Sequence, residues 1–276
     1  MALMPAYRSG EWSAYGVKTI CLFPHNREVG KDIHQGSVQL FSGDSGELLA
    51  VVNGSAITAI RTAAVSAVAT RLLARESAND LAIIGAGRQG MAHLTAMAEV
   101  RSLKKVRVAD IVFERAEQFA AEMSPKYAFP IEAVASAEAA VRNANIIVTI
   151  TTCTEPVLRR EWISDGAHLN LVGASLPHAR EVDGATVAAS KLYVDRREST
   201  LKESGDYLLA IKEGAIGPDH IQAEIGELLI GKARGRTADR DITMFKALGL
   251  AIEDLAAAHY LYCQAKQKQF GSWVEL

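Results

Sequence analysis

The chain has 276 residues, of which 49% are hydrophobic and 22% are charged, and its formal net charge is −2. This length and composition indicate a soluble globular protein with one large or two modest domains. The balanced charge disfavours a nucleic-acid partner, and the apolar runs fall short of a membrane span.

The cysteines and the N-terminus indicate a cytoplasmic location. Cys21, Cys153 and Cys263 are odd in number and far apart, which fits a reducing compartment better than a disulfide framework. The first residues lack the pattern of a secretory signal. No group of cysteines and histidines has the spacing of a metal site, so no metal is expected.

The first part of the chain combines strands with one long helix. Alternating apolar residues predict a strand over 17–23, and the turn at 42–46 predicts a hairpin of strands 37–41 and 47–53. An alanine-rich stretch with large apolar residues at helical spacing predicts a mostly buried helix over 55–74.

From residue 80 onward, strands and helices alternate. The candidate strands are 81–84, 105–109, 131–134, 145–150, 167–172 and 191–194, and the candidate helices are 88–100, 113–123, 136–142 and 183–189. This alternation predicts parallel βαβ units, and six such strands match a doubly wound sheet. Further helices are expected near 196–204 and 221–229, followed by a last long helix over 242–268.

We therefore expect an α/β fold with two domains. Residues 76–241 would form a Rossmann-type domain with a doubly wound parallel sheet, which binds a dinucleotide. Residues 1–75 and 242–276 would form a smaller α/β substrate domain that is made from both chain ends.

The most informative motif lies between residues 80 and 110. Gly85, Gly87 and Gly90 form G-x-G-x-x-G between a predicted strand and a predicted helix, and Asp110 ends the next strand. Gly85 allows a tight turn, Gly87 lets a pyrophosphate approach the backbone, and Gly90 lets the helix and the strand pack closely. Asp110 can accept hydrogen bonds from the adenosine ribose and would repel a 2′-phosphate. The motif predicts NAD rather than NADP, and the alternative is a glycine turn without a ligand.

Two cations are candidates for substrate binding. Lys18 lies inside a predicted strand, where it is either a solvent-facing lysine or a functional group. Arg61 is the only charged residue among residues 55–70. It is either a snorkelling arginine or the partner of an anion, such as a substrate carboxylate or a cofactor phosphate.

Small polar residues follow two of the predicted strands. Thr149, Thr151 and Thr152 lie at the end of one strand, and Gly173 and Ser175 follow the next. In open α/β sheets, ligands bind outside the carboxyl ends of the strands. These residues either contact ribose and nicotinamide or form ordinary strand ends and turns.

Together these segments resemble the ornithine cyclodeaminase/mu-crystallin family, and the similarity covers nearly the whole chain. The segments that carry the resemblance are Leu48–Thr70, Gly85–Gly90, Thr149–Pro156, Gly166–Ser175, Leu201–Asp206 and Thr243–Asp254. The chain looks closer to the mu-crystallin and reductase branch than to the cyclodeaminases. The resemblance implies a Rossmann-type cofactor domain, an α/β domain that forms a homodimer and the substrate pocket, and reversible chemistry at the α-carbon of amino or imino acids.

The resemblance also implies roles for individual residues. Lys18 would contact the substrate and assist proton transfer, and Arg61 would bind the substrate carboxylate or lie beside the nicotinamide. The residues that it places around NAD are Ser37, Thr62, Gly85, Ala86, Gly87, Arg88, Gln89, Asp110, Thr151, Thr152, Val172 and Ser175. Among them, Ala86, Arg88 and Gln89 would line the pyrophosphate, and Thr151, Thr152 and Val172 the nicotinamide end.

Two departures from the family pattern bear on the activity. Ser175 stands where cyclodeaminases carry an aspartate that handles the amine, which favours imine reduction or amine oxidation over cyclodeamination. Family members also carry roughly fifty further residues before the Met4-Pro5 stretch, including an arginine that holds the substrate carboxylate.

We therefore expect an NAD(H)-dependent oxidoreductase that acts on the C=N or C–NH bond of a small amino or imino acid. The type would be a ketimine or pyrroline-carboxylate reductase or an alanine dehydrogenase. The alternatives are an ornithine cyclodeaminase, which forms proline and ammonia with catalytic NAD, and a cofactor-binding protein with little catalysis.

Overall fold

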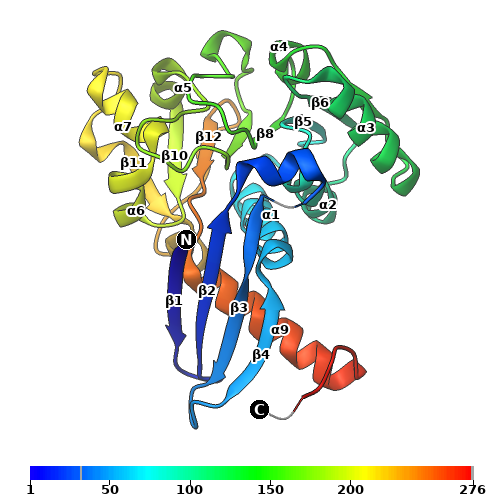
Figure 1. Ribbon diagram of the computed structural model, residues 1–276. Coiled ribbons are helices and arrows are strands. Elements are labelled where there is room, and N and C mark those ends of the chain that lie inside the picture. Colours follow the sequence, from blue (N-terminus) through cyan, green and yellow to red (C-terminus); the bar gives the residue numbers. More distant parts are fainter. Residues whose placement is uncertain (32, 275–276) are drawn as a thin grey trace. The chain divides into compact units, whose positions relative to one another are not determined.

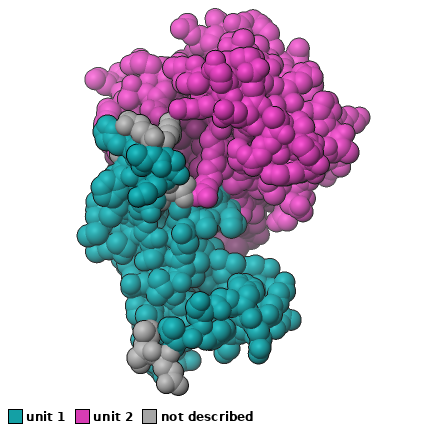
Figure 2. Space-filling view, turned by 45° about the vertical axis from the view of Figure 1, so that its right-hand side comes forward, with its two compact units in different colours: residues 1–61, 249–276 teal, residues 62–248 magenta. Residues whose placement is uncertain are grey.

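The computed structural model describes residues 1–31 and 33–274, and these fall into two compact units (Figure 2). Unit 1 comprises Met1–Arg61 and Gly249–Leu276, and unit 2 comprises Thr62–Leu248. The boundaries differ from the expected ones at 75/76 and 241/242. The first now falls inside a helix, α1 (Gly54–Leu73), and the second follows a strand that was not foreseen.

Unit 1 is built on an antiparallel sheet of four described strands, in the order β1-β2-β3-β4 (Figure 1). They are β1 (Ala2–Arg8), β2 (Ala14–Leu22), β3 (His34–Ser42) and β4 (Leu48–Asn53), and the long helix α9 (Ala251–Lys268) crosses them. The expected hairpin is present as β3 and β4, which pair antiparallel. Strand β1 was not predicted.

One face of this sheet packs on α9, and this face also carries Lys18. Ala14 of β2 and Leu40 of β3 are buried there with Leu255 of α9. Gly16 allows this contact, because a Cβ at that position would lie 2.8 Å from the Leu255 side chain. Since side chains alternate along a strand, Lys18 faces the same side as Ala14 and Gly16, and it is only 2% exposed.

Unit 2 contains a sheet of eight described strands, all parallel, in the order β11-β10-β12-β9-β8-β5-β6-β7. The strands are β5 (Asp80–Ile84), β6 (Lys105–Ala109), β7 (Ile131–Ala133), β8 (Ile146–Thr149), β9 (His168–Leu171), β10 (Ser190–Val194), β11 (Ile221–Glu224) and β12 (Ile242–Lys246). The chain reverses its direction of winding between β5 and β8, which is the switch point of a doubly wound fold. The predicted Rossmann-type α/β fold is confirmed, with eight strands instead of six.

Helices cover both faces of this sheet. They are α2 (Arg88–Val100), α3 (Phe113–Met123), α4 (Ala137–Val141), α5 (Gly184–Ala189), α6 (Arg197–Glu203), α7 (Gly205–Lys212) and α8 (Ile225–Leu229). Helices α2 and α3 share one core with Leu81 and Ile83 of β5, whereas α4, α5 and α7 share another with Ala82 and Ile84. Successive β5 residues thus point into opposite layers, as the pleat of a strand requires.

Two predicted helices are wrong in their first parts. Residues 221–229 form β11 and then α8, and the helix expected over 242–268 begins only at Ala251, because residues 242–246 form β12. All five β12 residues are buried between β9 and β10. Their apolar spacing also fits a helix, so the pattern alone did not separate the two structures.

Helix α1 is apolar enough to qualify as a membrane span by length and composition, contrary to the expectation from the sequence. However, 56% of its most apolar window is buried. Ala69 and Leu73 pack there with Tyr193 and Phe245 of unit 2. Interior helices of globular folds pass the same composition test, and burial accounts for the apolar character of this one.

A buried histidine joins α2 to α1 directly behind the glycine motif. The Nδ1–H of His93 donates to the Gln89 carbonyl (2.8 Å), which leaves Nε2 as the acceptor from the Ser66 hydroxyl (3.1 Å). The His93 side chain is fully buried, and burial lowers the pKa of His93 to about 4. The neutral ring therefore stabilises the packing of α2.

Acid should weaken unit 2 through this residue. The folded-state pKa of His93 lies below its ordinary value of 6.5, so its contribution is complete above pH 6.5 and is lost as the pH falls toward about 4. We expect the free energy of unfolding to fall over this range, by up to about 3 kcal/mol from this group.

Denaturant unfolding at several pH values checks this expectation. His93→Gln should show a shallower pH dependence than the wild type, whereas His178→Gln, at an exposed position, should keep the wild-type slope. An unchanged slope in His93→Gln would contradict the assignment.

Candidate functional site

The glycine motif forms a tight, open turn between β5 and α2. Gly85 has φ +110°, and a Cβ there would lie 2.4 Å from the Ile150 carbonyl oxygen. A Cβ on Gly90 would lie 2.5 Å from the Gly85 carbonyl oxygen, so this residue too must be glycine. By contrast, Gly87 has nothing within 4 Å of its Cβ position and, like Arg88, is exposed. The N-cap residue of α2 is Gly87, which has no side chain to cap the helix, and helix N-termini that follow a glycine turn are typical phosphate-binding sites.

Asp110 holds the glycine turn and the loop after β6 together. One carboxylate oxygen accepts from the Ala86 N–H (2.9 Å), and the other accepts from the Val112 N–H (3.0 Å). Each oxygen keeps lone pairs for a further donor, as a ribose diol would supply. Ile111, which follows, is fully exposed and provides an apolar surface beside the carboxylate.

The carboxyl ends of β8 and β9 lie in contact. A Cβ on Gly173 would lie 2.1 Å from the Thr151 carbonyl oxygen and 2.6 Å from Oε1 of Glu181, so only glycine fits there. Next to this contact, Thr152 and Ser175 are exposed and Val172 is half-buried.

Unit 1 contains a buried cluster of charges. Asp254 is 1% exposed and pairs with two cations: its Oδ2 lies 2.8 Å from Lys18 Nζ, and its Oδ1 lies 3.2 Å from Arg61 Nε. Arg61 Nη1 also pairs with Glu253 Oε2 at 2.8 Å. Burial, and next the charge of Arg61, lower the pKa of Lys18, whereas Asp254 acts in the opposite direction.

A glycine makes room for the guanidinium of this cluster. Gly249 has φ +88°, and a Cβ there would lie 2.5 Å from Nη1 of Arg61. Lys18 comes from β2, Arg61 from α1, and the two acids from the first turn of α9, so the cluster joins segments from both chain ends.

The structure groups the predicted residues into two sets. Lys18 and Arg61 meet in unit 1, through Asp254. The second set lies along the carboxyl ends of the strands of unit 2: Gly85, Ala86, Gly87, Arg88, Gln89, Asp110, Thr151, Thr152, Val172 and Ser175. Thr62 is buried on α1. Ser37 pairs with Thr19 in the sheet of unit 1 and therefore faces away from the side that carries Lys18.

The acidic partners of these residues were not predicted from the sequence. Asp254 and Glu253 hold the two cations, and Glu181 bonds to the ends of β8 and β9. Asp254 lies within one of the family segments, where a charged pair among apolar residues was the available signal.

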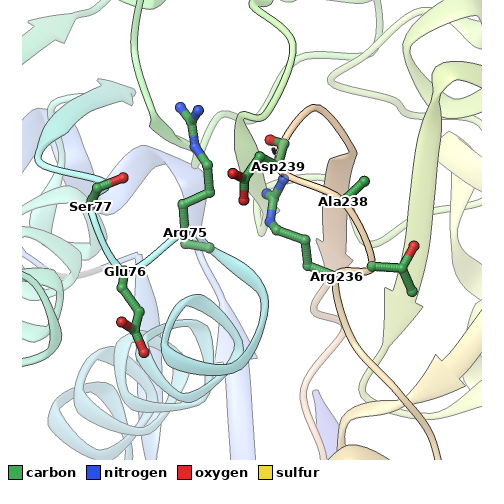
Figure 3. Close-up of a pocket in the computed structure, with 8 residues that line it drawn as sticks. Arg75, Glu76, Ser77, Arg236, Ala238 and Asp239 are labelled. Atoms are coloured by element: carbon green, nitrogen blue, oxygen red, sulfur yellow. Dashed lines mark hydrogen bonds between the residues drawn. The ribbon is translucent and has the colours of Figure 1, made fainter.

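A cavity of about 540 Å³ lies elsewhere in unit 2, lined by Arg75, Arg236 and neighbouring residues (Figure 3). All three guanidinium nitrogens of Arg236 donate inside the protein, to the carbonyls of Leu73, Asp239, Asp241 and Ala167 and to the Thr243 hydroxyl. These bonds make Arg236 a structural residue, and we do not assign the cavity to the functional site.

The fold and the glycine turn define a dinucleotide-binding α/β protein. The sequence model of the ornithine cyclodeaminase/mu-crystallin family matches residues 1–269. The chain therefore belongs to this family, as its motifs predicted.

Individual relatives agree with this placement. The chain is 42% identical to the ketimine reductase mu-crystallin of Mus musculus over 262 residues, which cover 95% of this chain and 79% of the relative. It is similar to the Thermococcus litoralis Delta(1)-pyrroline-2-carboxylate reductase in complex with NADH and L-proline, with a TM-score of 0.92, 39% identity, and coverage of 98% of this chain and 88% of that one. An archaeal alanine dehydrogenase dimer with bound NAD has a TM-score of 0.89 and 29% identity, covering 99% of this chain and 87% of that one.

Removing the central carboxylate of the charge cluster should be costly. Asp254→Asn leaves two buried cations, Lys18 and Arg61, without their shared partner, and we expect a loss of about 3–5 kcal/mol in the free energy of unfolding. Glu253→Gln is the matched control, because Glu253 is more exposed than Asp254, at 16%, and the glutamine oxygen can still accept from Nη1 of Arg61; it should cost clearly less than Asp254→Asn. Urea unfolding of both variants measures the difference, and equal losses would argue against the central place of Asp254.

Proposed function

We propose that the chain is an NAD-dependent reductase of small cyclic imino acids, which it converts to the corresponding amino acids. The observation that carries the proposal is the buried cluster of Lys18, Arg61 and Asp254 in a chain that also has a dinucleotide turn ending on Asp110. The predicted class of activity, reduction of a C=N bond, agrees with the ketimine and pyrroline-carboxylate reductases to which the chain is similar.

Unit 2 would hold the cofactor. The backbone N–H groups at the start of α2, beside Gly87 and Arg88, suit the pyrophosphate, and Asp110 suits the adenosine ribose. The carboxylate of Asp110 would repel a 2′-phosphate, which favours NADH over NADPH. Thr151, Thr152 and Val172 would lie along the nicotinamide end.

Unit 1 would hold the substrate. The Arg61 guanidinium can bind a carboxylate through two parallel N–H donors, although Nη1 now donates to Glu253, which must share or yield this contact. Lys18 would then donate a proton to the imine nitrogen from its ammonium group.

The environment of Lys18 suits a proton donor. Burial and the charge of Arg61 lower the pKa of Lys18, so its proton is released more readily than that of an exposed lysine. Asp254 holds the ammonium in place by an ion pair. NADH, when bound, supplies the hydride for the carbon of the C=N bond; with one proton on nitrogen, the bond becomes CH–NH.

The open face of the sheet in unit 1 favours a homodimer. Leu3, Tyr7, Tyr15 and Val51 lie on the side away from α9 and are 62%, 52%, 46% and 61% exposed. Tyr7 and Tyr15 stack at 4.5 Å between ring centroids, so the face is apolar and continuous across β1 and β2. Such a face is typical of a protein interface. We propose that a second copy of this chain covers it, and that unit 1 is the substrate and dimerisation domain.

Sedimentation tests the dimer. Tyr15→Glu should shift the protein to monomers, because it puts a charge on the covered face. Leu229→Glu, at a 54% exposed position in unit 2, should leave the dimer intact. A wild-type monomer, or a dimer that is insensitive to Tyr15→Glu, would contradict this assignment.

Steady-state oxidation of NADH with a panel of substrates tests the activity. We expect turnover with five- and six-membered cyclic imino acids, and little with NADPH. Release of proline and ammonia from ornithine without net NADH oxidation would favour a cyclodeaminase. NADH binding without turnover on the panel, or with pyruvate and amines, would favour a cofactor-binding protein.

Replacing Lys18 should separate chemistry from cofactor binding. Lys18→Met keeps the volume and leaves Asp254 paired with Arg61, and we expect kcat to fall by about 100-fold or more with an unchanged Kd for NADH. In the wild type, kcat should fall as the pH rises through the lowered pKa of Lys18, below the ordinary 10.5, because the donor must be protonated. Equal losses of kcat and NADH affinity would exclude the role of Lys18 as a proton donor.

A further inference from the structure

Glu181 is a fully buried carboxylate that joins the carboxyl ends of two neighbouring strands. Its Oε1 accepts from the N–H and the hydroxyl of Thr151, both at 2.8 Å. Its Oε2 accepts from the N–H groups of Gly173 (2.7 Å) and Ala174 (3.3 Å). The side chain is 0% exposed, and all four of these donors come from residues just beyond β8 and β9.

A second buried layer holds Glu181 in place. Asp206 Oδ1 accepts from the backbone N–H groups of Glu181 (2.7 Å) and Val182 (3.2 Å). Its Oδ2 lies 2.9 Å from Lys246 Nζ, and Lys246 donates in turn to the Ala174 carbonyl at 2.5 Å. Asp206 and Lys246 are 3% and 1% exposed, so both side chains are shielded from solvent. The network closes on itself at Ala174, whose N–H donates to Glu181 and whose carbonyl accepts from Lys246.

Holding two strands together does not in itself require a charge. Parallel strands are held by their backbone ladder, and an apolar side chain could fill the same space without the desolvation that a buried carboxylate suffers. Burial raises the pKa of Glu181 overall and the charge of Asp206 adds to the rise, whereas Lys246 and the N–H and hydroxyl of Thr151 act in the opposite direction. The carboxylate fixes the orientation of the three N–H groups and the one hydroxyl that donate to it.

The hydroxyl of Thr151 is the group whose direction matters most. Because its proton goes to Glu181, the oxygen is left to act as an acceptor toward other groups. Its other neighbour is the Cys153 thiol at 2.8 Å, itself half-buried. A hydroxyl oxygen fixed as an acceptor suits a ligand that presents N–H groups, such as the carboxamide of nicotinamide.

We propose that Glu181 is a positioning residue for the nicotinamide half of the cofactor, acting through Thr151 and Gly173. The inference rests on the proposed function for the identity of the cofactor. Glu181 touches neither cofactor nor substrate; it fixes the strand ends that contact the nicotinamide, and it should not affect the adenosine half.

The test compares NADH with ADP-ribose, which lacks the nicotinamide ring. In Glu181→Gln, an amide N–H replaces an acceptor oxygen and faces N–H donors. We expect the Kd for NADH to rise about tenfold, which is about 1.4 kcal/mol, with a fall in kcat and with the Kd for ADP-ribose within about twofold of the wild type. Isothermal titration measures both affinities.

Asp183→Asn is the matched control. Asp183 lies in the same segment as Glu181 but caps α5, where its Oδ1 accepts from the Thr186 N–H at 2.8 Å. This variant should lose stability without changing the ratio of the two affinities, so it separates a general loss of folding from a loss of positioning.

Thr151→Val and Thr151→Ser cover the case in which Glu181→Gln does not fold. Valine removes the hydroxyl and should weaken NADH but not ADP-ribose, whereas serine retains the hydroxyl and should restore NADH binding. Equal weakening of both ligands in Glu181→Gln, or unchanged NADH binding in Glu181→Gln and Thr151→Val, would overturn the inference. A wild-type protein that does not bind NADH would instead overturn the proposed function.

Discussion

Buried charges that share partners shape both units of this protein. In unit 1, a single carboxylate, Asp254, pairs with Lys18 and Arg61, and all three side chains are at most 9% exposed. A buried ion without a partner costs several kcal/mol, so β2, α1 and α9 are constrained to bring these groups together. Unit 2 contains a second buried ion pair, between Lys246 and Asp206. There Asp206 accepts from the Glu181 N–H, and Glu181 bonds to the ends of β8 and β9. In both places the charges fix atoms that the chemistry would use.

Close backbone contacts impose the second constraint. Gly85, Gly90 and Gly173 each lie where a Cβ would meet a carbonyl oxygen at 2.5 Å or less. Gly87 is different, because its Cβ position is open. Three of these four glycines are therefore required by the fold itself, and the fourth leaves room for a ligand.

Local sequence patterns predicted most of unit 2. Helices α2 and α3 and strand β6 have the predicted bounds, because their periodicity and flanking turns are clear within each segment. β12 was mistaken for helix, since five consecutive buried residues, from Ile242 to Lys246, give no alternation to read. β1 was missed as well, and Pro5 within it weakens the signal of a strand. The site divides in the same way. The glycine turn and Asp110 lie within one motif, whereas Asp254 pairs with Arg61 across 193 positions and Glu181 bonds to Thr151 across 30, and no spacing rule reports such pairs.

Asp110 has two tasks at once, and this limits how the protein could change its cofactor. The carboxylate that would select an unphosphorylated ribose also fixes the Ala86 N–H in the glycine turn and the Val112 N–H in the next loop. Exchanging Asp110 for a basic residue would release both N–H groups, and a neutral asparagine could keep only one of them, so either change would disturb the phosphate turn along with the ribose site. A lineage that moved toward NADPH would therefore have to rebuild the turn together with its cofactor selectivity. The fully exposed Ile111 is the neighbouring position where substitution by a lysine or arginine would break no side-chain hydrogen bond.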